Sequence, residues 1–169
     1  MSTAPNSATP PSTANVSPNE VIPASVQENI EVMRRWFHEV WNEGRVEAIH
    51  ELFAANGVAT GHYGDRSVIH GPEEFVPFYK QIRASFSNMK TTIEDAFGIG
   101  DKVAVRWTAV MTHSGDGMGV PPTGNVVKIT GTTIARIADG KVIEGWDNWD
   151  RLGLLEQIGL YASPASRAA

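Results

Sequence analysis

The 169-residue chain contains no cysteine. This absence excludes disulfides, thiolate nucleophiles and cysteine-ligated zinc. Basic residues are also scarce, with 14 Lys and Arg against 19 Asp and Glu, a net charge of −5, and no basic run. Nucleic acids and anionic membrane surfaces are bound through clustered basic side chains, so we expect neither as a partner.

Long hydrophobic runs are missing as well. No stretch approaches the roughly 20 apolar residues of a membrane span. The first basic residue is Arg34 and no apolar run precedes it, unlike a secretory signal peptide. We therefore expect a soluble, cytoplasmic protein. The five histidines show no His-x-His or His-x-x-x-His spacing, so we expect no metal site.

The composition divides the chain into one domain and two tails. Residues 1–24 hold five prolines, a single charge and no aromatic residue, which predicts a disordered tail. Residues 25–160 are expected to form one α+β domain, because 41% apolar residues over the whole chain support a folded core. Residues 161–169 are expected to be a flexible C-terminal tail.

Within the domain, helical patterns come first and strands follow. A capping box at 25–28 opens a helix whose apolar stripe recurs every three or four residues, at Val26, Ile30, Met33, Phe37 and Val40. Gly44 is expected to end it, and further helices are predicted at 45–54, from 71 to 86 and at 150–158, with Asp150 as the cap of the last. Strands are predicted at 58–63, 90–97, 102–113, 125–137 and 142–149. Helices then cover one face of a curved antiparallel sheet.

Strand alternation sorts the polar residues by face. Along 102–113 it groups Arg106 with Ala104, Thr108 and Val110, and it groups Trp107 with Val103 and Val105 on the other face. A two-residue turn at Asp139 and Gly140 would pair Thr132 with Asp147, whereas a bulge would pair Thr133 with it.

Several consecutive segments resemble the SnoaL-like polyketide (ester) cyclase family of the nuclear transport factor 2-like superfamily. They are GDKVAVRWT at 100–108, THSG at 112–115, GVPPTG at 119–124, RIADGKVIEGWDNWD at 136–150 and LGLLEQIG at 152–159. The resemblance covers about residues 26–160. It implies a cone-shaped curved antiparallel sheet wrapped around N-terminal helices, an internal pocket, and a homodimer joined through the outer face of the sheet.

The same resemblance places Asp147 where these cyclases keep an acid/base aspartate. A carboxylate in a partly apolar cone can act as a general base, although an Asp here could instead lie on the rim. Arg106 is its expected partner, either in catalysis or as a structural pair, and Thr108 stands where related epoxide hydrolases have a second aspartate. His113 matches the family's Thr-His motif and is the third catalytic candidate.

The remaining candidates are expected to line the pocket. They are His62, Thr108, Thr132, Thr133, Trp107, Trp146 and Trp149. The tryptophans could instead belong to the core or to a dimer interface, which is the more frequent place for such a stripe. The face of Val103, Val105 and Trp107 is the expected dimer patch. The Gly- and Pro-rich loop 114–123 is either a lid or a plain surface connection.

Two functions fit these residues. The first is an enzyme doing cofactor-free acid/base chemistry on a small hydrophobic molecule, by cyclisation, isomerisation, or hydration and hydrolysis. The alternative is a non-catalytic ligand-binding or carrier protein with the same fold. Polyketide cyclases that close rings by aldol chemistry set a His beside the Asp, where this chain offers Thr132 and Thr133.

Overall fold

The computed structural model describes residues 24–63 and 67–161. The predicted tails, 1–24 and 161–169, lie almost entirely outside the described residues. Five helical segments are described: α1 Ala24–Arg35, the π-helix η1 Trp36–Asn42, α2 Val46–Leu52, α3 Gly71–Ser85 and α4 Arg151–Gln157. The strands are β1 Phe53–Thr60, β2 Val68–His70, β3 Phe86–Ile99, β4 Lys102–His113, β5 Val126–Ala138 and β6 Lys141–Trp149.

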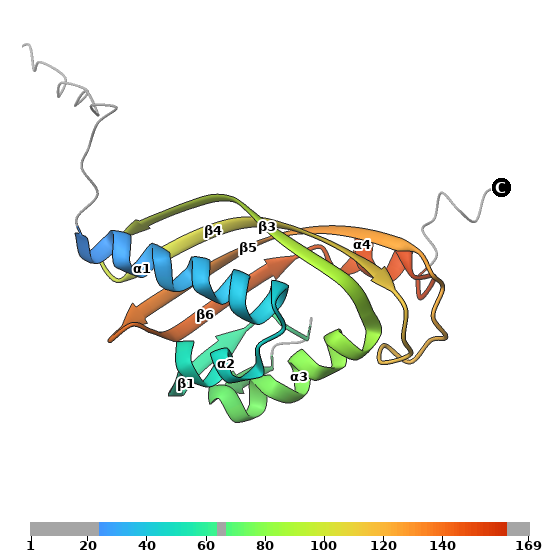
Figure 1. Ribbon diagram of the computed structural model, residues 1–169, viewed down its shortest axis with the longest axis horizontal. Helices are drawn as coiled ribbons and strands as arrows, with labels where there is room; N and C mark the ends of the chain where they lie inside the picture. Colours follow the sequence, from blue (N-terminus) through green and yellow to red (C-terminus); the bar gives the residue numbers. More distant parts are fainter. Residues whose placement is uncertain (1–23, 64–66, 162–169) are drawn as a thin grey trace, which may run out of the picture.

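The described strands form one six-stranded sheet in the order β2-β1-β6-β5-β4-β3. Its long strands arch over α1, η1, α2 and α3, which gives the expected α+β architecture of a curved sheet wrapped around helices (Figure 1). The sheet is mixed, however, because β1 pairs parallel with β6. The expectation of a fully antiparallel sheet is wrong at this pair. The two strands are far apart in the sequence, with α3 and β3–β5 between them, so no hairpin makes them antiparallel.

The first helix buries the predicted stripe from Val26 to Val40. Ser25, the expected cap, already lies inside α1, and the helix widens into η1 from Trp36 onward. Gly44, with φ +77°, ends the helical segment as predicted. No helix in the ranges 24–63 and 67–161 is long and apolar enough to cross a membrane.

The faces of β4 are the reverse of the predicted arrangement. Val103, Val105 and Trp107 point into the core, whereas Arg106 is exposed on the outer face. The expected apolar dimer patch at Val103, Val105 and Trp107 is therefore wrong. Both faces of β4 carry small or apolar residues, so the alternation alone did not distinguish inside from outside.

The pairing of β5 with β6 contains the bulge that the sequence left open. Ile137 pairs with Val142, but the next pair along is Arg136 with Glu144, so Ile143 is skipped. The shift places Thr133 opposite Asp147 and Thr132 opposite Asn148. Thr133 is thus the threonine that shares a face with Asp147.

Strand β3 forms one edge of the sheet and starts earlier than predicted. Phe86, expected on the third helix, is its first residue. A register shift follows between Ser87 and Lys90, where Asn88 has φ +52°. Beside this bulge, the Asn42 side chain accepts a hydrogen bond from the Thr91 N–H (2.6 Å) and donates one to the Thr91 carbonyl (2.9 Å).

Candidate functional site

A cavity opens between the helices and the inner face of the sheet. It leaves about 110 Å³ for the centres of water-sized molecules. Eight aromatic side chains dominate its wall: Trp36, Phe37, Trp41, Phe53, Phe75, Phe78, Trp107 and Trp149. Among the described residues that line it, His62 and Asp147 are the ionisable ones and none is Lys or Arg. The cavity therefore suits a neutral, largely apolar molecule with one polar region.

Asp147 forms the polar end of the cavity, and both of its carboxylate oxygens have a polar neighbour. Thr133 Oγ1 donates to Oδ1 at 2.5 Å, and His62 Nε2 lies 3.1 Å from Oδ2. Trp107 Nε1 in turn donates to Thr133 Oγ1 at 3.0 Å, which orients the hydroxyl toward the carboxylate. The Asp147 side chain keeps 17% exposure, so it remains open to a ligand.

The surroundings of Asp147 make its carboxyl harder to ionise than a free one. Burial raises the pKa of Asp147 above its ordinary value of 3.8, because the apolar wall solvates the charged form poorly. The nearby His62 and the hydrogen bond from Thr133 oppose that rise in pKa without cancelling it. A raised pKa makes the carboxylate a stronger base at the pH where it is ionised.

A close backbone contact brings His62 to Asp147. β1 runs parallel to β6 up to the pair of Thr60 with Trp146, and Gly61 follows with φ +91°. A Cβ at Gly61 would lie only 1.8 Å from the Asp147 carbonyl oxygen, so a side chain there would push the two strands apart. The Trp149 indole N–H also donates to the Gly61 carbonyl at 3.1 Å. Glycine is therefore needed to place the next residue beside the carboxylate.

His62 itself lies between two phenylalanines. Its ring meets Phe75 and Phe78 edge-on, with centroids 5.3 and 5.0 Å away, and its side chain is only 10% exposed. Nδ1 is buried and has no hydrogen-bond partner among residues 24–63 and 67–161. Since Nε2 is the one nitrogen that meets a polar group, His62 acts on the site through Asp147.

Four predicted site residues lie on the outer face of the sheet instead. Arg106, with 58% side-chain exposure, is bonded to Asp95 at 2.6 Å, so its expected pairing with Asp147 is wrong. Thr108 follows on the same outer face, and Trp146 is 37% exposed there. The bulge at Ile143 turns Thr132 outward as well. The inverted face of β4 accounts for Arg106 and Thr108. Trp146 points outward because it alternates with Asp147 along β6.

His113 is buried at the far end of β4 and does not line the cavity. Its Nδ1 accepts a hydrogen bond from the Thr123 N–H at 3.3 Å, and its ring packs on Phe86. The loop after β4 is further tied by the Ser114 and Gly115 N–H groups, which donate to the Ser85 carbonyl. His113 therefore fastens this loop, and its expected place among the cavity residues is wrong.

The structure also brings residues into the site that the sequence had not singled out. Trp36 and Trp41 from η1 and Phe75 and Phe78 from α3 line the cavity. The spacing of five between the two tryptophans was the available signal. No group of three or more His, Asp or Glu side chains suited to a metal ion occurs in the described part of the chain.

The fold and the site define a cone-type α+β protein with an internal cavity and a carboxylate at one end of it. The profile of the SnoaL-like polyketide cyclases matches residues 31–158, so the chain belongs to this family. No curated protein matches the chain at the sequence level.

Solved structures show the same fold. A candidate SnoaL-like polyketide cyclase from Jannaschia sp. CCS1 aligns with a TM-score of 0.76 and 24% identity, over 85% of this chain and 100% of that one. IdmH, a candidate polyketide cyclase from Streptomyces antibioticus, aligns with a TM-score of 0.67 and 31% identity, over 78% and 98%. AclR, a candidate hydroxylase from Streptomyces galilaeus, aligns with a TM-score of 0.71 and 24% identity, over 82% and 85%.

Proposed function

We propose that the protein is an enzyme that transfers protons on a small hydrophobic substrate in the cavity, with Asp147 as the acid/base group. The observation that carries this proposal is the setting of the Asp147 carboxyl. It stands at the end of an aromatic cavity, burial raises its pKa, and a hydroxyl bonds to it and an imidazole lies beside it in place of a permanently charged Arg or Lys. Such a carboxyl can both take and return a proton.

The proposed step begins with ionised Asp147. Its carboxylate takes a proton from a carbon next to a substrate carbonyl, the C–H electrons form the enolate double bond, and the carbonyl oxygen gains the negative charge. Thr133 and His62 hold the carboxylate during this step, and Trp107 holds Thr133. Protonated Asp147 then returns the proton to another atom of the substrate. Isomerisation uses this sequence directly. In ring closure the enolate carbon first bonds to the carbon of a second carbonyl group, whose C=O π electrons move to its oxygen, and that oxygen takes the proton from Asp147.

The relatives favour cyclisation among these reactions. The family is that of the polyketide cyclases, and IdmH, at 31% identity, is a candidate polyketide cyclase. We therefore place a polyketide-derived or similar carbonyl compound first as the substrate. The base and its supporting donors all come from the chain, so this chemistry needs no cofactor.

Deuterium exchange tests the proposal without knowledge of the product. The full chain is incubated in D₂O with a panel of aryl ketones, and mass spectrometry follows deuterium entering beside the carbonyl. We expect exchange above the buffer rate for at least one ketone, abolished by Asp147→Asn and unaffected by Asp95→Asn, a matched change on the outer face. Ketones that bind but never exchange would instead identify a ligand carrier. A ligand retained on purification and identified by mass spectrometry would extend the panel.

A further inference from the structure

The π-helix η1 carries two tryptophans, Trp36 and Trp41, that both line the cavity. A π-helix bonds each residue to the fifth one along, and these two residues stand five apart. One turn of η1 therefore brings both indoles to the same side, whereas an α-helix would turn residues five apart away from each other. Short π-helical segments occur frequently at functional sites.

Among the residues that the structure describes, none accepts a hydrogen bond from the indole N–H of Trp36. Two other cavity tryptophans have used theirs, since Trp107 donates to Thr133 and Trp149 to the Gly61 carbonyl. Neither Trp36 nor Trp41 has a side-chain hydrogen bond to any residue in the described ranges. Trp36 is only 9% exposed. Its nitrogen is nevertheless not fully buried, unlike the two unpaired nitrogens His62 Nδ1 and His113 Nε2. A donor in this situation can be satisfied by a ligand.

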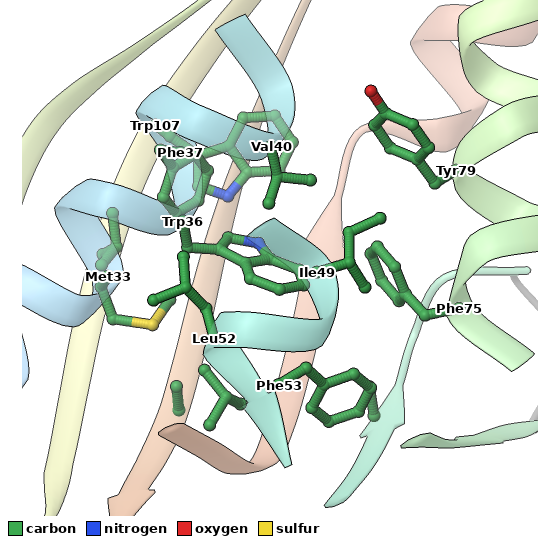
Figure 2. Close-up of a cluster of buried hydrophobic side chains, with 14 of the residues drawn as sticks. Met33, Trp36, Phe37, Val40, Ile49, Leu52, Phe53, Phe75, Tyr79 and Trp107 are labelled. Carbon is green, nitrogen blue, oxygen red and sulfur yellow. The ribbon is translucent and has the colours of Figure 1, made fainter. Parts of the chain in front are cut away.

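Phe75 links these indoles to the acid/base end of the cavity. Its ring centroid lies 5.2 Å from that of Trp36, 6.2 Å from that of Trp41 and 5.3 Å from that of His62. Figure 2 shows the Trp36 indole in the middle of the cluster, with Phe75 and Phe53 beyond one end and Phe37 and Trp107 beside it. Phe75 is itself only 1% exposed, so these contacts fix the two indoles and His62 in one aromatic wall of the cavity. The Asp147 carboxyl lines the same cavity, so a flat molecule in it has both the indoles and the carboxyl in its wall.

We propose that the Trp36 indole N–H, joined by that of Trp41, binds the carbonyl oxygen of the substrate. The inference rests on the proposed function and deepens it, because it defines the substrate as a neutral aromatic or polycyclic carbonyl compound. Proton removal by Asp147 moves negative charge onto that oxygen, and a positioned N–H stabilises the charge more than it stabilises the ground state. The wall offers no Lys or Arg among its described residues for this task, and the indoles of Trp107 and Trp149 already donate to other groups, which leaves the indole N–H groups of Trp36 and Trp41.

Indole N–H signals in ¹⁵N NMR of the full chain test the proposal. The probe is 2-acetylnaphthalene, and its control is 2-isopropenylnaphthalene, in which a CH₂ group replaces the carbonyl oxygen at nearly the same shape. The sequence has five tryptophans, so single Trp→Phe variants assign every signal. We expect the ketone to move the Trp36 proton downfield relative to the alkene, with Trp41 following. Trp146, on the outer face, should not respond.

Affinity supplies the second measurement. Trp36→Phe keeps an aromatic ring but lacks the N–H, so it should weaken ketone binding by roughly 2- to 12-fold, the net effect of one hydrogen bond, and leave alkene binding unchanged. If Trp36→Phe folds poorly, 3-benzothienylalanine at position 36 keeps the indole shape with sulfur in place of N–H. The proposal would be overturned if the Trp36 signal moved equally with the ketone and the alkene, or if Trp36→Phe weakened the binding of both equally. It would also be overturned if the wild type did not bind the ketone at its highest soluble concentration. Asp147→Asn should retain the Trp36 response while losing exchange, which separates this proposal from the proposed function.

Discussion

Replacement of Asp147 by Asn tests the role of the carboxyl most directly. Asn keeps the volume, its carbonyl oxygen can still accept the hydrogen bond from Thr133, and its amide can face His62 Nε2. It cannot take a proton, so deuterium exchange should fall by about 10²- to 10⁴-fold, as is usual when a general base is lost. The fold should survive, because the variant leaves no permanently charged partner buried.

The variant also removes a pH dependence of stability. Burial raises the folded-state pKa of Asp147 above 3.8, so the native state binds the proton more tightly than the unfolded chain does. The stability that this group contributes is complete below pH 3.8 and is lost as the pH rises through the folded-state pKa. Each unit of upward shift corresponds to about 1.4 kcal/mol of stability lost at higher pH. Asp147→Asn should lack this loss.

Two measurements decide the outcome. Thermal unfolding from about pH 4 to about pH 8 should show that the Tm of the wild type declines relative to that of Asp147→Asn, and exchange assays should show the loss of activity. Asp95→Asn is the matched control and should change neither. A fully active Asp147→Asn would refute the acid/base role. Destabilisation by about 3–5 kcal/mol would instead show that Asp147 and His62 form a structural pair.

Three further predictions follow from the site and the surface. Thr133→Val removes the hydrogen bond that lowers the pKa of Asp147, so the pH at which exchange sets in should rise, whereas Thr132→Val on the outer face should leave the profile unchanged. We also propose a homodimer through the outer face of the sheet, which exposes Val110, Ile134 and Trp146. Sedimentation at micromolar concentration should give twice 18.3 kDa for the wild type and a monomer for Ile134→Glu. A wild type that sediments at 18.3 kDa would contradict the dimer. Deletion of residues 1–23 should leave the Tm and the oligomeric state unchanged, and a Tm lower by several degrees would show that this segment packs on the domain.

Local signals predicted most of the elements. Strand β4 has its predicted bounds, because period-two alternation ends at clear turns on both sides. The hairpin at Asp139 and Gly140 is confirmed by positive φ at both residues, 51° and 71°. Asp150 caps α4 as expected by accepting the Gly153 N–H at 2.8 Å.

The parts that depend on distant pairing were beyond local signals. Strand β2 has three residues, and the parallel pairing of β1 with β6 leaves no trace in either strand's own pattern. That pairing is what carries His62 to Asp147, so the sequence could place His62 near the cavity without identifying its partner. The prediction for Arg106 was wrong for a related reason. Both faces of β4 carry small or apolar residues, and a single bulge at Ile143 decides which residues of β5 share the face of Asp147.

The Asn42 side chain also affects whether another molecule can add a strand to the edge of the sheet. β3 is a 14-residue strand at the border of the sheet, and such a border is a template onto which a strand of another molecule can add. By engaging both the N–H and the carbonyl of Thr91, Asn42 occupies the groups that an incoming strand would need at that point. The bulge around Asn88 bends the border next to it. One amide from η1 therefore blocks the addition of a further strand at this point of the sheet border.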